Sequence, residues 1–88
     1  MIIALDEHGK SFTTQELATK LGTMQNEQQD IAILIGGADG LDLNLLKPRA
    51  HYWSLSPLTF PHQLARFIII EQLYRALTIL HHHPYHRI

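Results

Sequence analysis

The stretch that decides the fold is HYWSLSPLTFPHQLARF, residues 51–67. It begins with an aromatic and apolar segment, HYWSL (51–55), which predicts a buried strand. Two turns rich in serine, proline and threonine follow. Pro61 then opens a helix of roughly 20 residues, because proline fits the first helical turn, and Thr59 or Ser56 is expected to cap it. A strand, a hydroxyl-rich loop and a long helix predict one βα unit of a parallel sheet.

Two further apolar runs extend this unit into a sheet. IIAL (2–5) and IAILI (31–35) predict strands, since each is short, continuous and stopped by polar or glycine residues. TTQE (13–16) has capping-box spacing and starts a helix that ends near Gly22 or continues further. DLNLLK (42–47) predicts a second, short helix. The order β-α-β-α-β-α, with strands apolar throughout, predicts an α/β fold: a small parallel sheet with helices on both faces.

The length and composition of the chain exclude several classes of protein and of functional site. The 88 residues (1–88) form at most one domain, and a chain this short is marginal as a monomer. Since it has no cysteine, a disulfide framework, a thiolate metal site and a cysteine nucleophile are excluded. The longest apolar run, FIII (67–70), is too short to span a bilayer, and MIIALDEHG (1–9) is not a signal peptide. We therefore expect a cytoplasmic protein without a membrane partner.

Charge is divided unevenly along the chain. Residues 1–44 carry two lysines and seven carboxylates, a net charge of −5, whereas residues 45–88 carry five cationic side chains and one carboxylate, a net charge of +4. Six of the seven histidines also lie in the second half. A basic end of this kind can contact phosphates, or it can be an ordinary solvated helix face.

The long helix has apolar residues around most of its circumference between positions 64 and 80. One side can pack on the sheet, which leaves a second apolar side without cover. A helix that is apolar nearly all round is buried nearly all round. In so small a protein, a homodimer through the C-terminal helix is the simplest expectation.

Three loops follow the carboxyl ends of the expected strands: LDEHG (5–9), IGGADG (35–40) and LSPLTF (55–60). Ligands of open parallel sheets bind at this edge, so adjacent strands would bring the loops into one crevice. IGGADG lacks both the dinucleotide-binding and the phosphate-loop spacing. It offers close backbone approach to a flat ligand, or it is a plain turn. These observations define a crevice but no reaction.

The C-terminal segment HHHPYH (81–86) is rich in imidazole. It matches no zinc-ligand spacing and has no acidic partner nearby, so we expect no metal site. Aromatic, imidazole and guanidinium groups can stack on nucleic acid or pair with a second subunit, and packing within the chain is the alternative.

Several of these segments together resemble one family. IGGADG (35–40), SLSPLTFPHQLAR (54–66), IIEQLYRA (69–76) and HPYHR (83–87) are similar to the bacterial 23S ribosomal RNA (pseudouridine-N3)-methyltransferases of the SPOUT, or α/β-knot, superfamily. The match runs from about Ile2 to Arg87. Family members carry roughly two fifths more chain before the strand that matches IIAL, so the sequence looks like the C-terminal part of the family enzyme without the usual N-terminal segment.

The resemblance implies a trefoil knot, a dimer through the C-terminal helix and S-adenosylmethionine as cofactor. It assigns cofactor binding to eight residues, namely Leu5, Gly36, Leu55, Ser56, Pro57, Leu58, Thr59 and Phe60. His62 is the candidate that accepts or relays the proton of the target nitrogen, although a helix N-terminal histidine can also bond only locally. The residues expected to contact RNA are Arg66, Tyr85, His86 and Arg87.

The implied function is methylation of N3 of a pseudouridine in 23S ribosomal RNA of the large subunit. The alternative is a truncated, non-catalytic α/β-knot module that folds and dimerises and still binds S-adenosylmethionine. A flavodoxin-like nucleotide binder is disfavoured because the chain has no phosphate loop.

Overall fold

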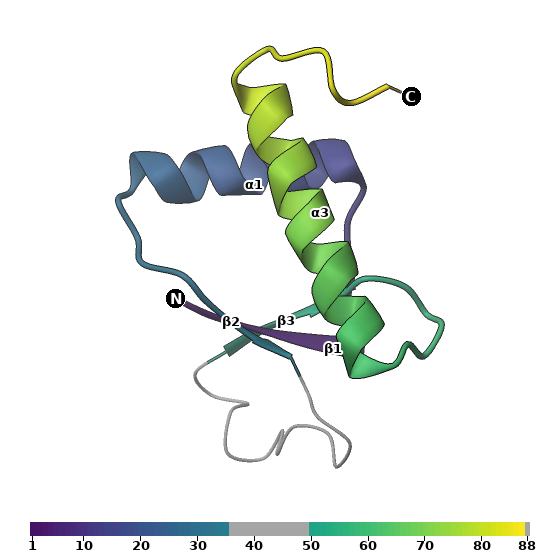
Figure 1. Ribbon diagram of the computed structural model, residues 1–88. Coiled ribbons are helices and arrows are strands. Elements are labelled where there is room, and N and C mark those ends of the chain that lie inside the picture. The colour runs from purple at the N-terminus through teal and green to yellow at the C-terminus, as the bar shows by residue number, and fades with distance from the viewer. Residues whose placement is uncertain (36–49, 88) are drawn as a thin grey trace.

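The computed structural model describes residues 1–35 and 50–87 of the chain (Figure 1). Its elements in chain order are β1 (Ile2–Ser11), α1 (Thr14–Asn26), β2 (Ala32–Ile35), β3 (Ala50–Ser54) and α3 (His62–Leu80). The three predicted strands and both long helices are therefore confirmed. The short helix expected at 42–47 lies outside the described residues.

The sheet has the order β2-β1-β3, and β1 pairs parallel with both neighbours. Ile3 lies opposite Ile33 on one side and opposite His51 on the other. The predicted parallel sheet is thus confirmed. Because all three strands run the same way, their carboxyl ends meet at one edge, where ligands of such sheets bind.

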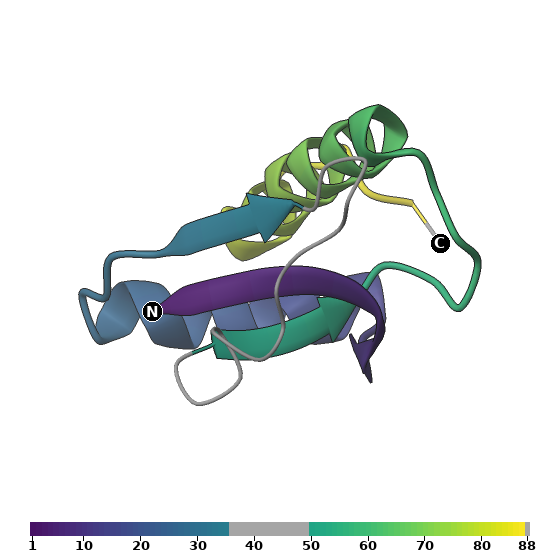
Figure 2. The ribbon, with the colours of Figure 1, turned by 90° about the horizontal axis from the view of Figure 1, so that it is seen from below.

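Both described helices lie on the same side of the sheet, with α3 crossing α1 (Figures 1 and 2). The neighbouring residues Ile3 and Ala4 point to opposite faces of β1, and both are almost fully buried. Side chains on both faces of the central strand are therefore buried at this point, as expected for a parallel strand. A helix on the second face remains a prediction.

The core lies between the sheet and the two helices. Its buried side chains come from β1, α1, β3 and α3, namely Ile3, Leu17, Ala18, Met24, Trp53 and Ala76. Gly22 marks a close contact of the helices, since a β-carbon there would lie 3.1 Å from a methyl group of Leu80.

The predicted capping box starts α1. The amide of Glu16 donates to Oγ1 of Thr13 at 3.1 Å, and the amide of Thr13 donates to Oε1 of Glu16 at 2.9 Å. The hydrogen bonds from the backbone and side chain of Thr13 to the carboxylate lower the pKa of Glu16, because they favour its ionised form. Past Gly22 the helix continues to Asn26.

Two local predictions about the chain were wrong. No side chain caps α3: Pro61 is its N-cap residue, and the hydroxyls of Ser56 and Thr59 bond elsewhere. The first strand is also longer than IIAL. It runs to Ser11, because Lys10 and Ser11 pair with β3 again after residues 6–9, which are not paired with it.

Candidate functional site

The β3–α3 loop, residues 55–61, is folded by its own hydroxyl groups. Ser54, at the end of β3, donates from its hydroxyl to the carbonyl of Ser56 at 2.9 Å. The amide of Leu58 donates to the hydroxyl of Ser56 at 3.0 Å. Such serine turns hold a short loop without regular secondary structure. The hydroxyls of Ser54 and Ser56 therefore stabilise the conformation of the loop itself.

A second loop meets it from β1. Leu5 and Lys10 both lie opposite Trp53 of β3, so residues 6–9 form an excursion between two paired parts of the same strand. We call residues 6–9 the β1 excursion. Gly9 lies against the backbone of Tyr52 and Trp53, where no β-carbon fits. This close approach fixes the end of the excursion beside β3.

One side-chain bond joins the two loops. The hydroxyl of Thr59 donates to Oε2 of Glu7 at 2.5 Å. The β1 excursion and the β3–α3 loop thus lie together, as the sequence predicted for residues 5–9 and 55–60. The third loop of the expected crevice, with Gly36, lies outside the described residues.

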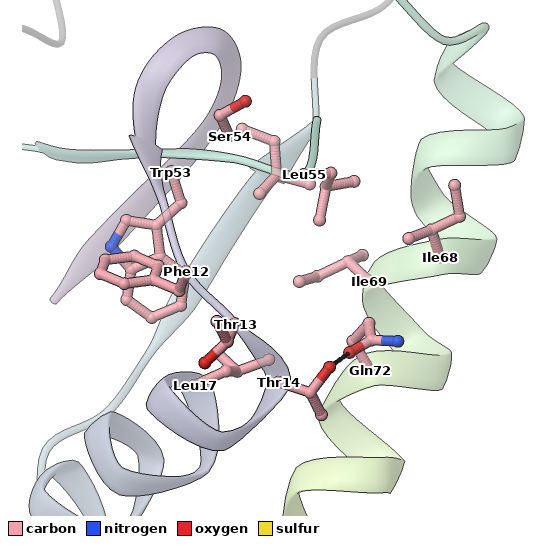
Figure 3. Close-up of a pocket in the computed structure, with 11 residues that line it drawn as sticks. Phe12, Thr13, Thr14, Leu17, Trp53, Ser54, Leu55, Ile68, Ile69 and Gln72 are labelled. Carbon is pink, nitrogen blue, oxygen red and sulfur yellow. Dashed lines mark hydrogen bonds between the residues drawn. The ribbon is translucent and has the colours of Figure 1, made fainter. Parts of the chain in front are cut away.

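A cavity of about 250 Å³ lies beside these loops, between the end of the sheet and the two helices (Figure 3). Phe12 and Trp53 form one wall through an edge-to-face contact with ring centroids 5.2 Å apart, and Ile69 of α3 faces them. Leu5 and Leu55 border the cavity at the strand ends. It is a partly apolar space that opens beside the β3–α3 loop.

The cavity also has a polar edge. The hydroxyl of Thr14, at the start of α1, donates to Oε1 of Gln72 on α3 at 2.8 Å (Figure 3). Nε2 of Gln72 in turn donates to Oε2 of Glu71 at 2.9 Å. A continuous set of bonds therefore leads from the cavity wall to the outer side of α3.

On that outer side lies a cluster made of Glu71, Arg75, Tyr85 and His86. Nε and Nη2 of Arg75 lie 2.8 and 2.6 Å from Oε1 of Glu71. The Tyr85 hydroxyl donates to the same oxygen at 3.2 Å, and Arg75 donates to Nδ1 of His86 at 3.1 Å. We call these four residues the tail cluster, because they hold the chain after α3 against the helix.

Charge and ring contacts strengthen the tail cluster. The bond from Arg75 lowers the pKa of Glu71, and the same pairing raises the pKa of Arg75. The Arg75 guanidinium lies 4.8 Å from the ring centroid of Tyr85, which also packs edge-to-face on Tyr74. The predicted RNA residues Tyr85 and His86 are thus held on α3, whereas Arg87 is exposed.

The predicted base His62 and the predicted RNA residue Arg66 lie on an earlier part of α3 than this cluster. His62 and Arg66 are exposed in the first turns of α3. Glu71 follows His62 by nine positions, which corresponds to about 14 Å along a helix. One copy of the chain therefore does not bring His62 together with Tyr85 and His86.

The predicted cofactor residues fall into two groups. Leu5 and Leu55 line the cavity. The five residues of the range 56–60 form the neighbouring loop, in which Ser56 and Phe60 are half-buried and 57–59 are exposed. Sequence reasoning did not assign Glu7, Glu71 or Arg75. The last two carried a readable signal, since a glutamate four positions before an arginine on a helix predicts an ion pair.

Part of α3 presents apolar side chains to solvent. Leu64, Phe67, Ile70 and Tyr74 recur at helical spacing and are exposed, Phe67 by 78%. We call these four residues the α3 apolar face. It agrees with the apolar surplus expected from the sequence.

Two further properties concern residues 1–35 and 50–87, the described part of the chain. Neither long helix there has the length and apolarity needed to cross a bilayer. No three histidine, aspartate or glutamate side chains gather there as a metal site would require. His81–His83 instead form the turn that ends α3, where the amide of His83 donates to the carbonyl of Thr78 at 2.8 Å.

Comparison with known proteins identifies the family. Residues 1–86 match the family described as "Predicted SPOUT methyltransferase". Proteins named Ribosomal RNA large subunit methyltransferase H from Polynucleobacter necessarius and Saccharophagus degradans are 58% and 55% identical to the chain, over 86 and 85 residues. These alignments cover 98% and 97% of the chain but 64% and 55% of the two relatives. The chain, which spans little more than half the length of such relatives, belongs to the SPOUT methyltransferase family.

Proposed function

We propose that the chain is the core of an S-adenosylmethionine-dependent methyltransferase that methylates N3 of a pseudouridine in 23S ribosomal RNA. The cavity between Leu5 and Leu55 carries this proposal, since it lies at the carboxyl ends of two parallel strands. Relatives named as large-subunit ribosomal RNA methyltransferases supply the substrate class. A ribosomal substrate would place the protein in the cytoplasm.

The cavity fits part of the cofactor. Its 250 Å³ is smaller than the ~300–1,000 Å³ of typical ligand pockets, so it accommodates a ring system and not the whole molecule. Apolar walls from Leu5 and Leu55 suit an adenine ring, and the backbone of 56–60 would bind the remaining polar groups. Gly36 is the proposed contact from the third strand end.

The residues of the chain have separate tasks in this scheme. The bound cofactor supplies a methyl group on a sulfonium, which is already electrophilic. His62 accepts or relays the proton that leaves N3 of the base as the methyl group is transferred. The RNA contacts are Arg66, Tyr85, His86 and Arg87. The enzyme also orients the nitrogen in line with the methyl group.

A homodimer completes the proposal. Because about 14 Å of helix separates His62 from Glu71 in one copy, a second copy is the simplest source of a tail beside the first copy's loop. The α3 apolar face is the proposed contact, and the trefoil knot implied by the resemblance is part of the same architecture.

The alternative function is a non-catalytic α/β-knot module. Titration calorimetry with S-adenosylmethionine tests the cavity in either case. Saturable heat with one site per chain supports the cofactor assignment. A folded chain that gives no binding heat at millimolar cofactor contradicts it.

The variant His62→Ala distinguishes the catalytic function from the non-catalytic alternative. Proton transfer by a positioned side chain contributes about 10²–10⁴-fold to a rate, so the variant should methylate ribosomes at least ~100-fold more slowly. Its affinity for S-adenosylmethionine should stay unchanged, since the imidazole is not assigned to cofactor binding. Turnover equal to that of the wild type would refute the role of His62.

A further inference from the structure

The β1 excursion carries an acidic residue that no part of the proposed function uses. Glu7 lies two positions after Leu5, the last residue of the first paired part of the central strand β1. Its Oε2 accepts a hydrogen bond from the hydroxyl of Thr59, and its Oε1 lies 3.5 Å from Nε2 of the exposed His8. The contact with Thr59 spans 52 positions of the chain.

This bond differs from the others in the β3–α3 loop. The two bonds made by Ser54 and Ser56 are internal, so they shape the loop without fixing where it lies. The bond between Thr59 and Glu7 instead connects the loop to the excursion of the central strand. The excursion is itself held, because Gly9 lies against the backbone of Tyr52 and Trp53.

We infer that Glu7 is a positioning residue that holds the β3–α3 loop over the edge of the sheet in its ligand-binding form. This inference rests on the proposed function, in which residues 56–60 bind the cofactor through their backbone. Backbone donors and acceptors bind a ligand well when they are placed before it arrives. Glu7 would act through Thr59 and not by touching the cofactor.

The inference makes a specific prediction about variants. Glu7→Ala and Thr59→Val each remove one side of the bond, and each should weaken S-adenosylmethionine binding about tenfold. The double variant should be no weaker than either single variant, because both remove the same interaction. Glu7→Gln keeps an oxygen acceptor without charge and should lie between wild type and Glu7→Ala.

These variants also distinguish positioning of the loop by the bond between Glu7 and Thr59 from simple electrostatic attraction of the cofactor. S-adenosylmethionine carries positive charge, so any carboxylate near the site could favour its binding. If attraction alone acted, Glu7→Gln would equal Glu7→Ala and Thr59→Val would have no effect. Glu27→Ala is the matched control, since it removes the same charge at the far end of α1 (Figure 1).

The experiment combines three measurements on the 88-residue chain. Calorimetry gives the dissociation constant of S-adenosylmethionine, and thermal melting checks that each variant is folded with a near-normal midpoint. Amide hydrogen exchange at Leu58, whose N–H is bonded within the loop, reports loop order without any cofactor. Faster exchange in Glu7→Ala and Thr59→Val, but not in Glu27→Ala, is expected.

The outcomes separate the inference from the proposed function. Weaker binding that is non-additive, with faster exchange at Leu58, supports both. If the wild type binds no cofactor but Leu58 exchanges faster in Glu7→Ala and Thr59→Val, the positioning of the loop by Glu7 is supported and the proposed function fails. If the wild type binds the cofactor and all variants bind equally well, the positioning role of Glu7 is overturned and the proposed function stands.

Discussion

Gly9 is the residue at which the backbone leaves no room for a side chain. A β-carbon there would lie 2.6 and 2.7 Å from the carbonyl carbon and oxygen of Tyr52, and 2.8 Å from the amide nitrogen of Trp53. These atoms belong to a paired strand and cannot rotate away. The renewed pairing of β1 with β3 at Lys10 therefore depends on glycine at position 9.

Gly9→Ala should destabilise the chain by about 1–3 kcal/mol, the usual cost of forcing extra volume into a packed region. Urea unfolding followed by Trp53 fluorescence measures the change. Gly22→Ala is the comparison, because the nearest atom there is a methyl carbon of Leu80 at 3.1 Å, and the Leu80 side chain can move away. Equal stability of Gly9→Ala and wild type would contradict the close approach.

Glu71 gives the tail cluster a dependence on pH. Arg75 holds the pKa of Glu71 below its usual value of 4.5. Since the folded-state pKa is depressed, the stabilising contribution is present above the unfolded value and is lost as pH falls through the folded one. Acid should therefore release Arg75 and Tyr85 from Glu71.

Glu71→Gln tests this release. Between pH 6 and pH 3, wild type should lose more stability than Glu71→Gln, which has no carboxylate to protonate at this position. The difference should be small, because the pair is partly exposed. Urea unfolding at several pH values, with NMR shifts of Tyr85 as a local probe, gives the measurement. Parallel pH profiles for the two proteins would exclude the contribution of Glu71.

Among the elements, α3 has one face in the core and another in solvent. Ile69 and Ala76 are buried, whereas Phe67 and Ile70 of the α3 apolar face are exposed. Exposed apolar residues that line up along one helix mark an interaction surface more often than isolated ones do. We expect a second copy of the chain to cover this face.

Phe67→Glu should convert a dimer to a monomer of 10.1 kDa, because a carboxylate at the centre of the apolar face would be desolvated on association. Light scattering coupled to gel filtration measures the mass. Gln25→Glu, which adds the same charge on α1, should leave the mass unchanged. If the wild type is already monomeric at high concentration, the proposed interface is wrong.

The sequence predicted the regular elements well, for physical reasons. Continuous apolar runs gave β2 and β3 to within a residue or so at each end, and the capping box at Thr13 gave the start of α1. These signals are local, since periodicity and capping act within a few residues. The start of α3 was also near its predicted place, although its expected hydroxyl cap was wrong because both hydroxyls bond within or beside the loop.

The candidate site could be predicted only in part. That the loops after β1 and β3 share an edge follows from parallel pairing, and Leu5 and Leu55 do border one cavity. The bond between Glu7 and Thr59 was not predictable, because it depends on an excursion whose register no local pattern encodes. The tail cluster was missed for a similar reason: it needs the turn at His82, a residue with positive φ of 58°.

At the scale of the whole molecule, the cavity, the β3–α3 loop and the tail cluster are connected. Thr14 and Gln72 at the cavity wall lead through Glu71 to Arg75 and the tail. In one copy, however, the proposed base His62 and the tail lie at different heights along α3. We therefore propose that the complete site is built from two copies.

The measurement that tests the proposed function most directly is methyl transfer by this chain itself. Large ribosomal subunits that lack the modification are incubated with the 88-residue protein and S-adenosylmethionine labelled in its methyl group, and the digested 23S RNA is analysed by mass spectrometry. The predicted result is label at N3 of one pseudouridine, lost in His62→Ala. A folded chain that binds the cofactor yet leaves the RNA unlabelled would contradict the enzyme assignment and establish the non-catalytic module instead.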